Sequence, residues 1–258
     1  VYVPPGPTQR KPIERMTQDR HASYCNYRYF AEMVSAGVLE PDTVRRIIAW
    51  RRAHGGELLA MTRFEDHLDD WPVLNWARAM LEIGDVEHYQ LLLHAHLTHH
   101  QCLGWLPAPE QVSIRPDDSG ARHVWAGQVV PCQVTVPLML RWALLYELRD
   151  EETLLVAPAA LHRWTQGGGV SARGLLTRWG PVDLALHGEG ATLTATLSLP
   201  GAMPAQVRLR IPRPPGATVS LASVTGATEH HWDADAGVVS LRGGTAVRVV
   251  AEVTPAPA

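Results

Sequence analysis

The hydrophobic pattern of this chain changes its period once, and that change constrains the fold more than any other feature. Between about 26 and 150, apolar residues recur at helical spacing, as in residues 70–83. From about 165 onwards apolar and polar residues alternate, as in residues 193–199. A period near 3.6 is typical of helices that bury one face, and a period of two is typical of half-buried strands. The sequence therefore predicts an α+β, multidomain chain.

Pro, Gly and polar clusters divide the chain further. We expect an extended N-terminal arm at 1–22, a helical domain at 23–160 and a β domain at 161–258. About eight short strands in the last part predict an antiparallel β-sandwich. Within the helical domain Asp42 is the expected N-cap of the second helix, and a long irregular segment is expected at 102–128. The five predicted helices cover residues 27–36, 42–53, 70–83, 86–101 and 133–149.

Composition excludes several function classes. The net charge is −3 and 19% of residues are charged, so neither a nucleic-acid partner nor a membrane surface is indicated. The apolar run 138–148 is too short and too charged to cross a bilayer, and no signal peptide is present, which favours a cytoplasmic over a secreted location. The three cysteines are far apart and indicate neither a disulfide framework nor a zinc knuckle. The chain has nine Trp and only two Phe. Tryptophan is equally suited to stacking on a sugar ring and to packing in a helical core.

Three segments resemble six-hairpin, (α/α)6-toroid glycoside hydrolases. The first is the helix and turn Trp76-Ala-Arg-Ala-Met-Leu-Glu-Ile-Gly-Asp85, the second is the join from Leu154 to Gly180, and the third is the strand Val207-Arg-Leu-Arg-Ile-Pro-Arg-Pro. The resemblance implies an antiparallel helical-hairpin array followed by a β-sandwich, and hydrolysis of an oligosaccharide or polysaccharide without a cofactor. A full toroid has twelve helices and this chain supplies about five. The resemblance thus implies that another chain or a preceding portion completes it, and because the chain begins with Val1 we expect a piece of a longer polypeptide.

Glycoside hydrolysis needs two carboxyl groups, one protonated and one ionised. The densest cluster of ionisable residues lies at 63–70, where we take Asp66 or Glu65, but not both, as catalytic. The second catalytic candidate is Glu110, in a proline-rich loop whose apolar surroundings would raise its pKa. The alternatives stay open: a solvated loop whose Asp69 or Asp70 caps the next helix, and a solvent-facing carboxylate at Glu110.

Further polar and aromatic residues are candidates for holding a sugar by hydrogen bonds or by an arginine–carboxylate contact. The alternative is that Arg28 pairs with a helix carboxylate and that the tyrosines pack. The substrate-binding candidates are Arg20, His21, Tyr24, Asn26, Arg28, Arg63, His67, Asp69, Trp105 and Gln111.

The histidines at 94, 96, 99 and 100 do not predict a metal site. No HExxH occurs, and no carboxylate follows a histidine of this run by three or four residues. Packed or helix-capping histidines are expected instead, with no metal and no cofactor.

Two other functions compete with hydrolysis. A polysaccharide lyase acting on uronate-containing glycans would use Tyr24, Asn26, Arg28 and His67. A non-catalytic scaffold that binds glycans or another subunit would need none of the carboxylates named above.

Overall fold

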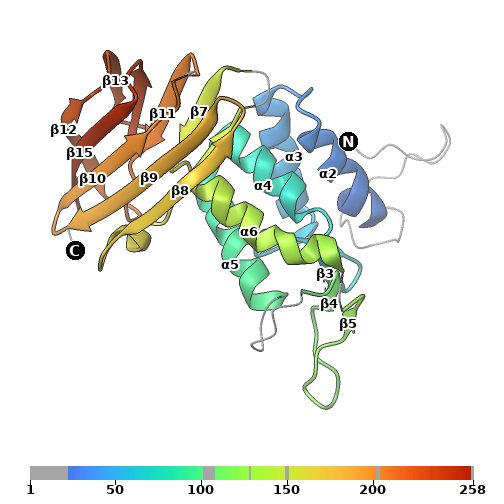
Figure 1. Cartoon of the computed structure of the whole chain (residues 1–258). Helices are drawn as coiled ribbons and strands as arrows, with labels where there is room; N and C mark the ends of the chain where they lie inside the picture. The colour runs from blue at the N-terminus through green and yellow to red at the C-terminus, as the bar shows by residue number, and fades with distance from the viewer. Residues whose placement is uncertain (1–22, 101–107, 128, 149–150, 202–203, 257–258) are drawn as a thin grey trace. The chain divides into compact units, whose positions relative to one another are not determined.

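The computed structural model describes residues 23–100, 108–127, 129–148, 151–201 and 204–256. Two compact units divide the chain, Val1–Leu140 and Arg141–Ala258. The described residues contain five α-helices and three five-stranded sheets, so the chain is α+β, as the sequence pattern predicts (Figure 1). No helix in these described ranges combines the length and the apolar character needed to cross a bilayer. The predicted arm at 1–22 lies outside the described residues.

The helices of the first unit begin and end close to the predicted positions. A π-helical turn, η1, leads directly into α2, and α4 and α5 form a hairpin joined at Gly84 and Asp85. The expected cap at Asp42 is wrong, because Pro41 occupies the first helical position and Glu40 precedes it as N-cap. The helices are η1 (Cys25–Phe30), α2 (Ala31–Ser35), α3 (Pro41–Ala53), α4 (Val73–Ile83), α5 (Val86–His99) and α6 (Val130–Leu144).

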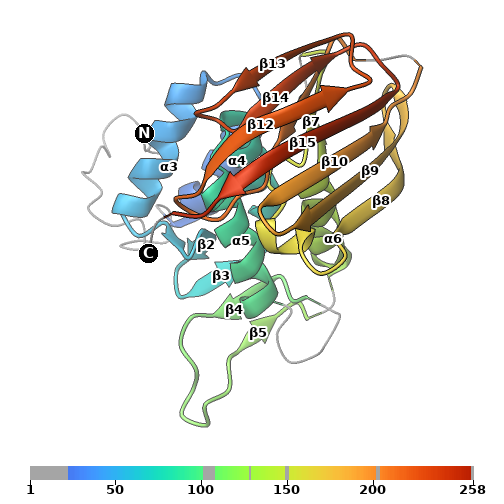
Figure 2. The ribbon, with the colours of Figure 1, turned by 90° about the vertical axis from the view of Figure 1, so that its left-hand side faces the viewer.

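The first sheet is an antiparallel meander in which consecutive strands pair. Two segments that the sequence suggested to be loops are parts of this sheet. The acidic stretch near residue 65 is a hairpin of β2 and β3, and the segment expected to be irregular contributes β4 and β5 (Figure 2). Short strands with charged residues at their ends carry too weak an alternation to be recognised by period alone. The strands are β1 (Glu57–Leu58), β2 (Met61–Phe64), β3 (His67–Asp69), β4 (Gln111–Ser113) and β5 (Val124–Trp125).

A buried arginine ties the helices of the first unit to its sheet. Arg51, on α3, is fully buried, and its guanidinium lies 3.6 Å from the centroid of the Trp76 ring on α4. It donates to the side chains of Asn26 at 2.8 Å and Thr62 at 2.9 Å, and pairs with Glu57 at 3.4 Å. Hydrogen bonds to three elements offset the cost of removing this charge from water.

The second unit consists of two five-stranded sheets, with orders β12-β15-β10-β9-β8 and β13-β14-β11-β7-β6. All pairs are antiparallel except β7 with β11. The fifth predicted helix is too long, because α6 ends at Leu144 and the next residues form β6. The strands are β6 (Leu145–Glu147), β7 (Thr153–Val156), β8 (Val170–Thr177), β9 (Gly180–Glu189), β10 (Thr192–Ser198), β11 (Gln206–Arg210), β12 (Thr218–Thr225), β13 (Glu229–Asp233), β14 (Val238–Arg242) and β15 (Ala246–Thr254).

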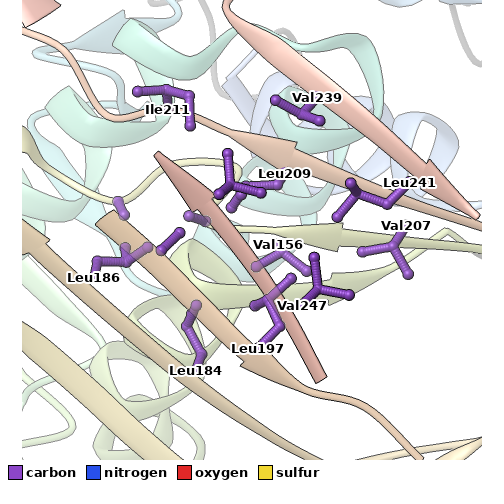
Figure 3. Packing of buried hydrophobic residues seen from close by; sticks show 14 of the residues in the cluster. Val156, Leu184, Leu186, Leu197, Val207, Leu209, Ile211, Val239, Leu241 and Val247 are labelled. Carbon is purple, nitrogen blue, oxygen red and sulfur yellow. The ribbon is translucent and has the colours of Figure 1, made fainter. Parts of the chain in front are cut away.

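Alternation along these strands builds one core shared by both sheets. Leu184 and Leu197 come from one sheet, and Val156, Leu209 and Val239 come from the other (Figure 3). None of these side chains is more than 3% exposed. Each buried side chain of this size contributes about 1.5–3 kcal/mol, so burial of the inward positions is the main stabilising term of the unit.

Candidate functional site

Two carboxylates lie side by side where β3 ends and β4 begins in the first unit. Asp69 and Gln111 are the last paired residues, and the pairing continues one step further because the Asp70 N–H donates to the Glu110 carbonyl at 2.8 Å. Residues directly opposite each other on antiparallel strands have Cβ atoms about 5 Å apart. Asp70 and Glu110 therefore lie side by side although 40 positions separate them in the sequence.

Asp70 is held by three neighbours and is only 3% exposed. One oxygen, Oδ1, is hydrogen-bonded to Nε2 of His96, and Oδ2 accepts a hydrogen bond from the Thr135 hydroxyl at 3.2 Å. Burial raises the pKa of this carboxyl, but hydrogen bonds from His96 and Cys132 and the attraction to His96 outweigh it, so the pKa lies below its ordinary value. Asp70 is thus an ionised, immobilised carboxylate.

The neighbours of Asp70 stay in defined protonation states. The Cys132 thiol remains protonated, because burial and its hydrogen bond to Asp70 raise the pKa well above the ordinary value. His100 stacks on His96 with ring centroids 5.0 Å apart, and burial lowers the pKa of His100 to about 3, so this ring is neutral. Within the described residues no group of three or more potential ligands could hold a metal ion.

A cavity of about 300 Å³ opens beside the two carboxylates. Its size is at the lower end of the range for small-molecule sites. Trp71 in its wall is 42% exposed, and its indole offers a flat apolar face. The lining consists of Asp70, Trp71, Leu74, Asn75, Glu110, Val129, Pro131, Cys132 and Thr135.

Asp69 lies just behind this lining and is fully buried. It accepts hydrogen bonds from the backbone N–H of Trp71 at 2.9 Å and from the Gln111 amide at 2.7 Å. Burial raises the pKa of Asp69 to about 7 and outweighs both hydrogen bonds, while the charges of Glu110 and Asp70 raise it further. Asp69 therefore exchanges a proton near neutral pH.

The π-helical turn η1 places Tyr27 near Asp69 and Glu110 and also carries the predicted residue Arg28. Burial, with the charges of Asp69 and Glu110, raises the pKa of Tyr27 to about 12, so its phenol keeps its proton. Arg28 pairs with Glu32 at 2.8 Å, as the structural alternative anticipates, and its guanidinium lies 4.9 Å from the centroid of the Trp71 ring.

Three other predicted residues have structural partners. Asn26 is fully buried; its amide donates to the carbonyls of Gly56 at 2.7 Å and Arg63 at 2.8 Å, and its oxygen accepts from Arg51. The amide is thus occupied and is not presented to a ligand, which removes one member of the lyase set. Tyr24 packs edge-on against Tyr27, with ring centroids 5.7 Å apart. Arg63 donates to the carbonyl of Glu65 and faces Asp66 at 3.7 Å.

Glu65 and Asp66 form the tip of the β2–β3 hairpin. Glu65 has a positive φ of 50°, and the Asp66 side chain is 81% exposed. The cavity that Glu110 lines includes neither of them. Asp69 and Asp70 do not cap α4 by their side chains either, because its N-cap is Pro72 and no side-chain cap bond is formed. The structure thus brings Glu110 together with Asp70 from the far end of the acidic cluster.

The remaining predicted residues divide into two groups. Gln111 contacts Asp69, and His67 packs against Trp125 with ring centroids 4.0 Å apart. Arg20, His21 and Trp105 lie outside the described residues. Trp71, Asn75, His96, Cys132 and Thr135 were not recognised as site residues from the sequence. The excess of tryptophan was a signal for Trp71 only.

No protein-family model matches the chain, and no curated protein matches it in sequence. Among the solved structures similar to this chain are the following two. One is the alpha-L-rhamnosidase of Streptomyces avermitilis complexed with L-rhamnose, with 16% identity and a TM-score of 0.45 over 86% of this chain and 21% of that chain. The other is a GH127 beta-arabinofuranosidase, with 12% identity and a TM-score of 0.46 over 95% of this chain and 46% of that chain. Both are glycosidases, and this chain spans less than half the length of either. TM-scores below 0.5 do not establish a shared fold.

Proposed function

We propose that this chain carries the catalytic carboxylates of a glycoside hydrolase, with Asp70 and Glu110 as the pair. The observation that supports this most is their placement on opposite positions of the β3–β4 ladder, both in the wall of one cavity. Like charges on opposite positions destabilise a sheet. We therefore infer that the two carboxylates are placed there for a function and not for stability.

The two carboxylates differ in their surroundings. Asp70 is ionised and fixed by His96 and Thr135. Within the described residues no hydrogen bond or ion pair engages the Glu110 side chain, which leaves it available to transfer a proton. We assign Glu110 as the acid that protonates the leaving oxygen and Asp70 as the carboxylate that attacks the anomeric carbon. Water, deprotonated by Glu110, then releases the sugar.

The assignment of Asp70 as the nucleophile implies retention of configuration, which in glycosidases goes with carboxyl groups about 5–5.5 Å apart. The exposed face of Trp71 is suited to stack on the sugar ring.

The architectural part of the proposal concerns the rest of the molecule. The α4–α5 hairpin supports an origin in an array of antiparallel helix pairs, such as an (α/α)6 toroid, and the two sheets around one core support a trailing β-sandwich. On this proposal a preceding portion of the polypeptide or another chain supplies the other helices.

The test is hydrolysis by the complete native protein and four variants: Glu110→Gln, Asp70→Asn, Asp66→Asn and Asp118→Asn. The substrates are p-nitrophenyl glycosides that include an α-L-rhamnoside and a β-arabinofuranoside. Glu110→Gln and Asp70→Asn keep side-chain size and are each expected to lower kcat/KM by a factor of about 10³ or more, since they remove a reacting group. Asp118→Asn, on an exposed loop, is the matched control and is expected to retain activity.

Three outcomes would contradict this assignment. If Asp66→Asn abolished hydrolysis and Asp70→Asn did not, the pair would lie at the hairpin tip instead. An unsaturated product absorbing in the ultraviolet would identify a lyase, and glycan binding without any turnover would identify a scaffold.

A further inference from the structure

Most polar side chains in the cavity beside Asp70 and Glu110 are already bonded to one another. The Thr135 hydroxyl donates to Oδ2 of Asp70 at 3.2 Å, and the Cys132 thiol is hydrogen-bonded to the same carboxylate. The other oxygen, Oδ1, is bonded to His96. A hydroxyl and a thiol each carry a single donor hydrogen. Thr135 and Cys132 therefore have no donor left for a ligand.

Two polar side chains of the lining, Asn75 and Glu110, have no hydrogen-bond or ion-pair partner among the residues that the structure describes. In the proposed reaction Glu110 serves the oxygen of the cleaved bond, so one carboxamide remains to bind hydroxyl groups. A hydroxyl that leaves water without gaining a hydrogen-bond partner costs free energy. A sugar ring that entered this cavity with all its hydroxyl groups would leave several of them unpaired.

The rest of the cavity wall is apolar and comes from two parts of the first unit. Trp71 and Leu74 lie just before α4 and in its first turn, and Val129 and Pro131 lie at the beginning of α6. Leu74 and Val129 are half-buried, and both line the same cavity as the two carboxylates. An apolar ligand group gains free energy by covering such a wall, whereas a hydroxyl group would lose its water there.

We propose that the substrate places an alkyl or aryl group against Leu74, Val129 and Pro131. The inference rests on the proposed function and adds the substrate class: a glycoside that carries an apolar group next to the cleaved bond. Two parts of a glycoside can supply this group, namely the methyl group of a 6-deoxy sugar and the alcohol that leaves as the aglycone. In both cases Leu74 and Val129 determine specificity and take no part in breaking the bond.

The first measurement compares sugars that differ in one hydroxyl group. We determine kcat/KM of the complete native protein for p-nitrophenyl fucosides, quinovosides and rhamnosides, and for the matching galactosides, glucosides and mannosides. The two members of each pair share the ring configuration and the leaving group. If the cavity holds the methyl group of the sugar, the 6-deoxy member is expected to be preferred about 10- to 100-fold.

The second measurement compares leaving groups. The substrates are the methyl, hexyl and octyl glycosides of the sugar that is cleaved best in the first measurement. Simple alkyl alcohols differ little in acidity, so a change in kcat/KM reports on contacts with the chain. If the cavity holds the aglycone, kcat/KM is expected to rise at least about 10-fold from the methyl to the hexyl glycoside.

Variants of the wall test whether this cavity causes the preference. Val129→Thr replaces a methyl group by a hydroxyl group with little change in shape, and is expected to reduce the preference about 10-fold. Val130→Thr is the matched control, because Val130 is 75% exposed and does not line the cavity. Leu74→Asn, of similar size, is a second variant with the same expected effect, and Leu91→Asn on the exposed side of α5 is its control.

The outcomes distinguish this inference from the proposed function. Equal kcat/KM within every pair of sugars, with no gain from longer alkyl chains, would overturn the apolar group while hydrolysis by Asp70 and Glu110 stands. A preference that Val129→Thr and Leu74→Asn both leave unchanged would overturn it as well. If the native protein cleaves none of these glycosides, the proposed function fails and the inference fails with it.

Discussion

Replacing Asp69 with asparagine is expected to change how the stability of the protein depends on pH. The carboxyl is fully buried and is held by the Trp71 N–H and the Gln111 amide. Asparagine keeps a carbonyl oxygen for the Trp71 N–H, and Gln111 can rotate its amide so that its oxygen accepts from the new NH₂ group. The substitution therefore removes the charge with little change in packing.

The magnitude follows from the raised pKa of Asp69, about 7 in the folded protein against an ordinary value of 3.8. Between these two values the folded state binds a proton that the unfolded state has released, so stability falls as pH rises through this window and is level above it. The difference of about 3 pKa units corresponds to about 4 kcal/mol in total, of which about 3 kcal/mol falls between pH 5 and pH 8.

The assay is the free energy of unfolding in urea from pH 5 to pH 9, with amide hydrogen exchange in α4 to report on the unit that holds Asp69. The stability of Asp69→Asn minus that of the unsubstituted protein should increase by about 3 kcal/mol between pH 5 and pH 8. Asp118→Asn, which alters an exposed carboxylate, should follow the unsubstituted protein. Parallel pH curves for Asp69→Asn and the unsubstituted protein would refute the reasoning about burial.

Two stability predictions follow from close contacts elsewhere. Gly226→Ala should lower the free energy of unfolding in urea by about 3 kcal/mol or more, because φ is +84° and a Cβ would lie 1.9 Å from a carbonyl oxygen of β15. The control Gly190→Ala, with φ +59° and open space, should lower it by about 1–2 kcal/mol. Equal losses of stability in the two variants would contradict the contact argument. Arg51→Met should lower the free energy of unfolding by about 3–5 kcal/mol in the same assay, since it leaves buried acceptors without their donor. The control Arg46→Met, on the exposed side of α3, should change the stability little. An unchanged stability in Arg51→Met would show that the buried charge is not needed.

The parts of the fold that depend on local pattern could be predicted from the sequence. The alternation in residues 193–199 corresponds to β10, and the helical spacing at 70–83 corresponds to α4. The strand β6 could not be predicted, because Leu145–Glu147 continues the apolar run of α6 and only its pairing with β7 makes it extended.

The candidate site was even harder to predict from the sequence than the fold. The acidic cluster was recognisable, but its density pointed to Asp66, which the hairpin turn places in solvent. Asp70 becomes a candidate only through the register of β3 on β4 and through His96, 26 residues away. Pairings between distant segments leave no periodic trace in a single sequence.

The parallel pairing of β7 with β11 has a consequence for dissecting this protein. β7 lies before residue 161, where the sequence suggests that the β part starts, yet it covers one side of β11. A recombinant fragment starting at that position would leave the N–H and C=O groups of 206–210 open to intermolecular pairing. The excised β half would then tend towards aggregation, whereas a cut upstream of β6 would keep β11 paired on both sides.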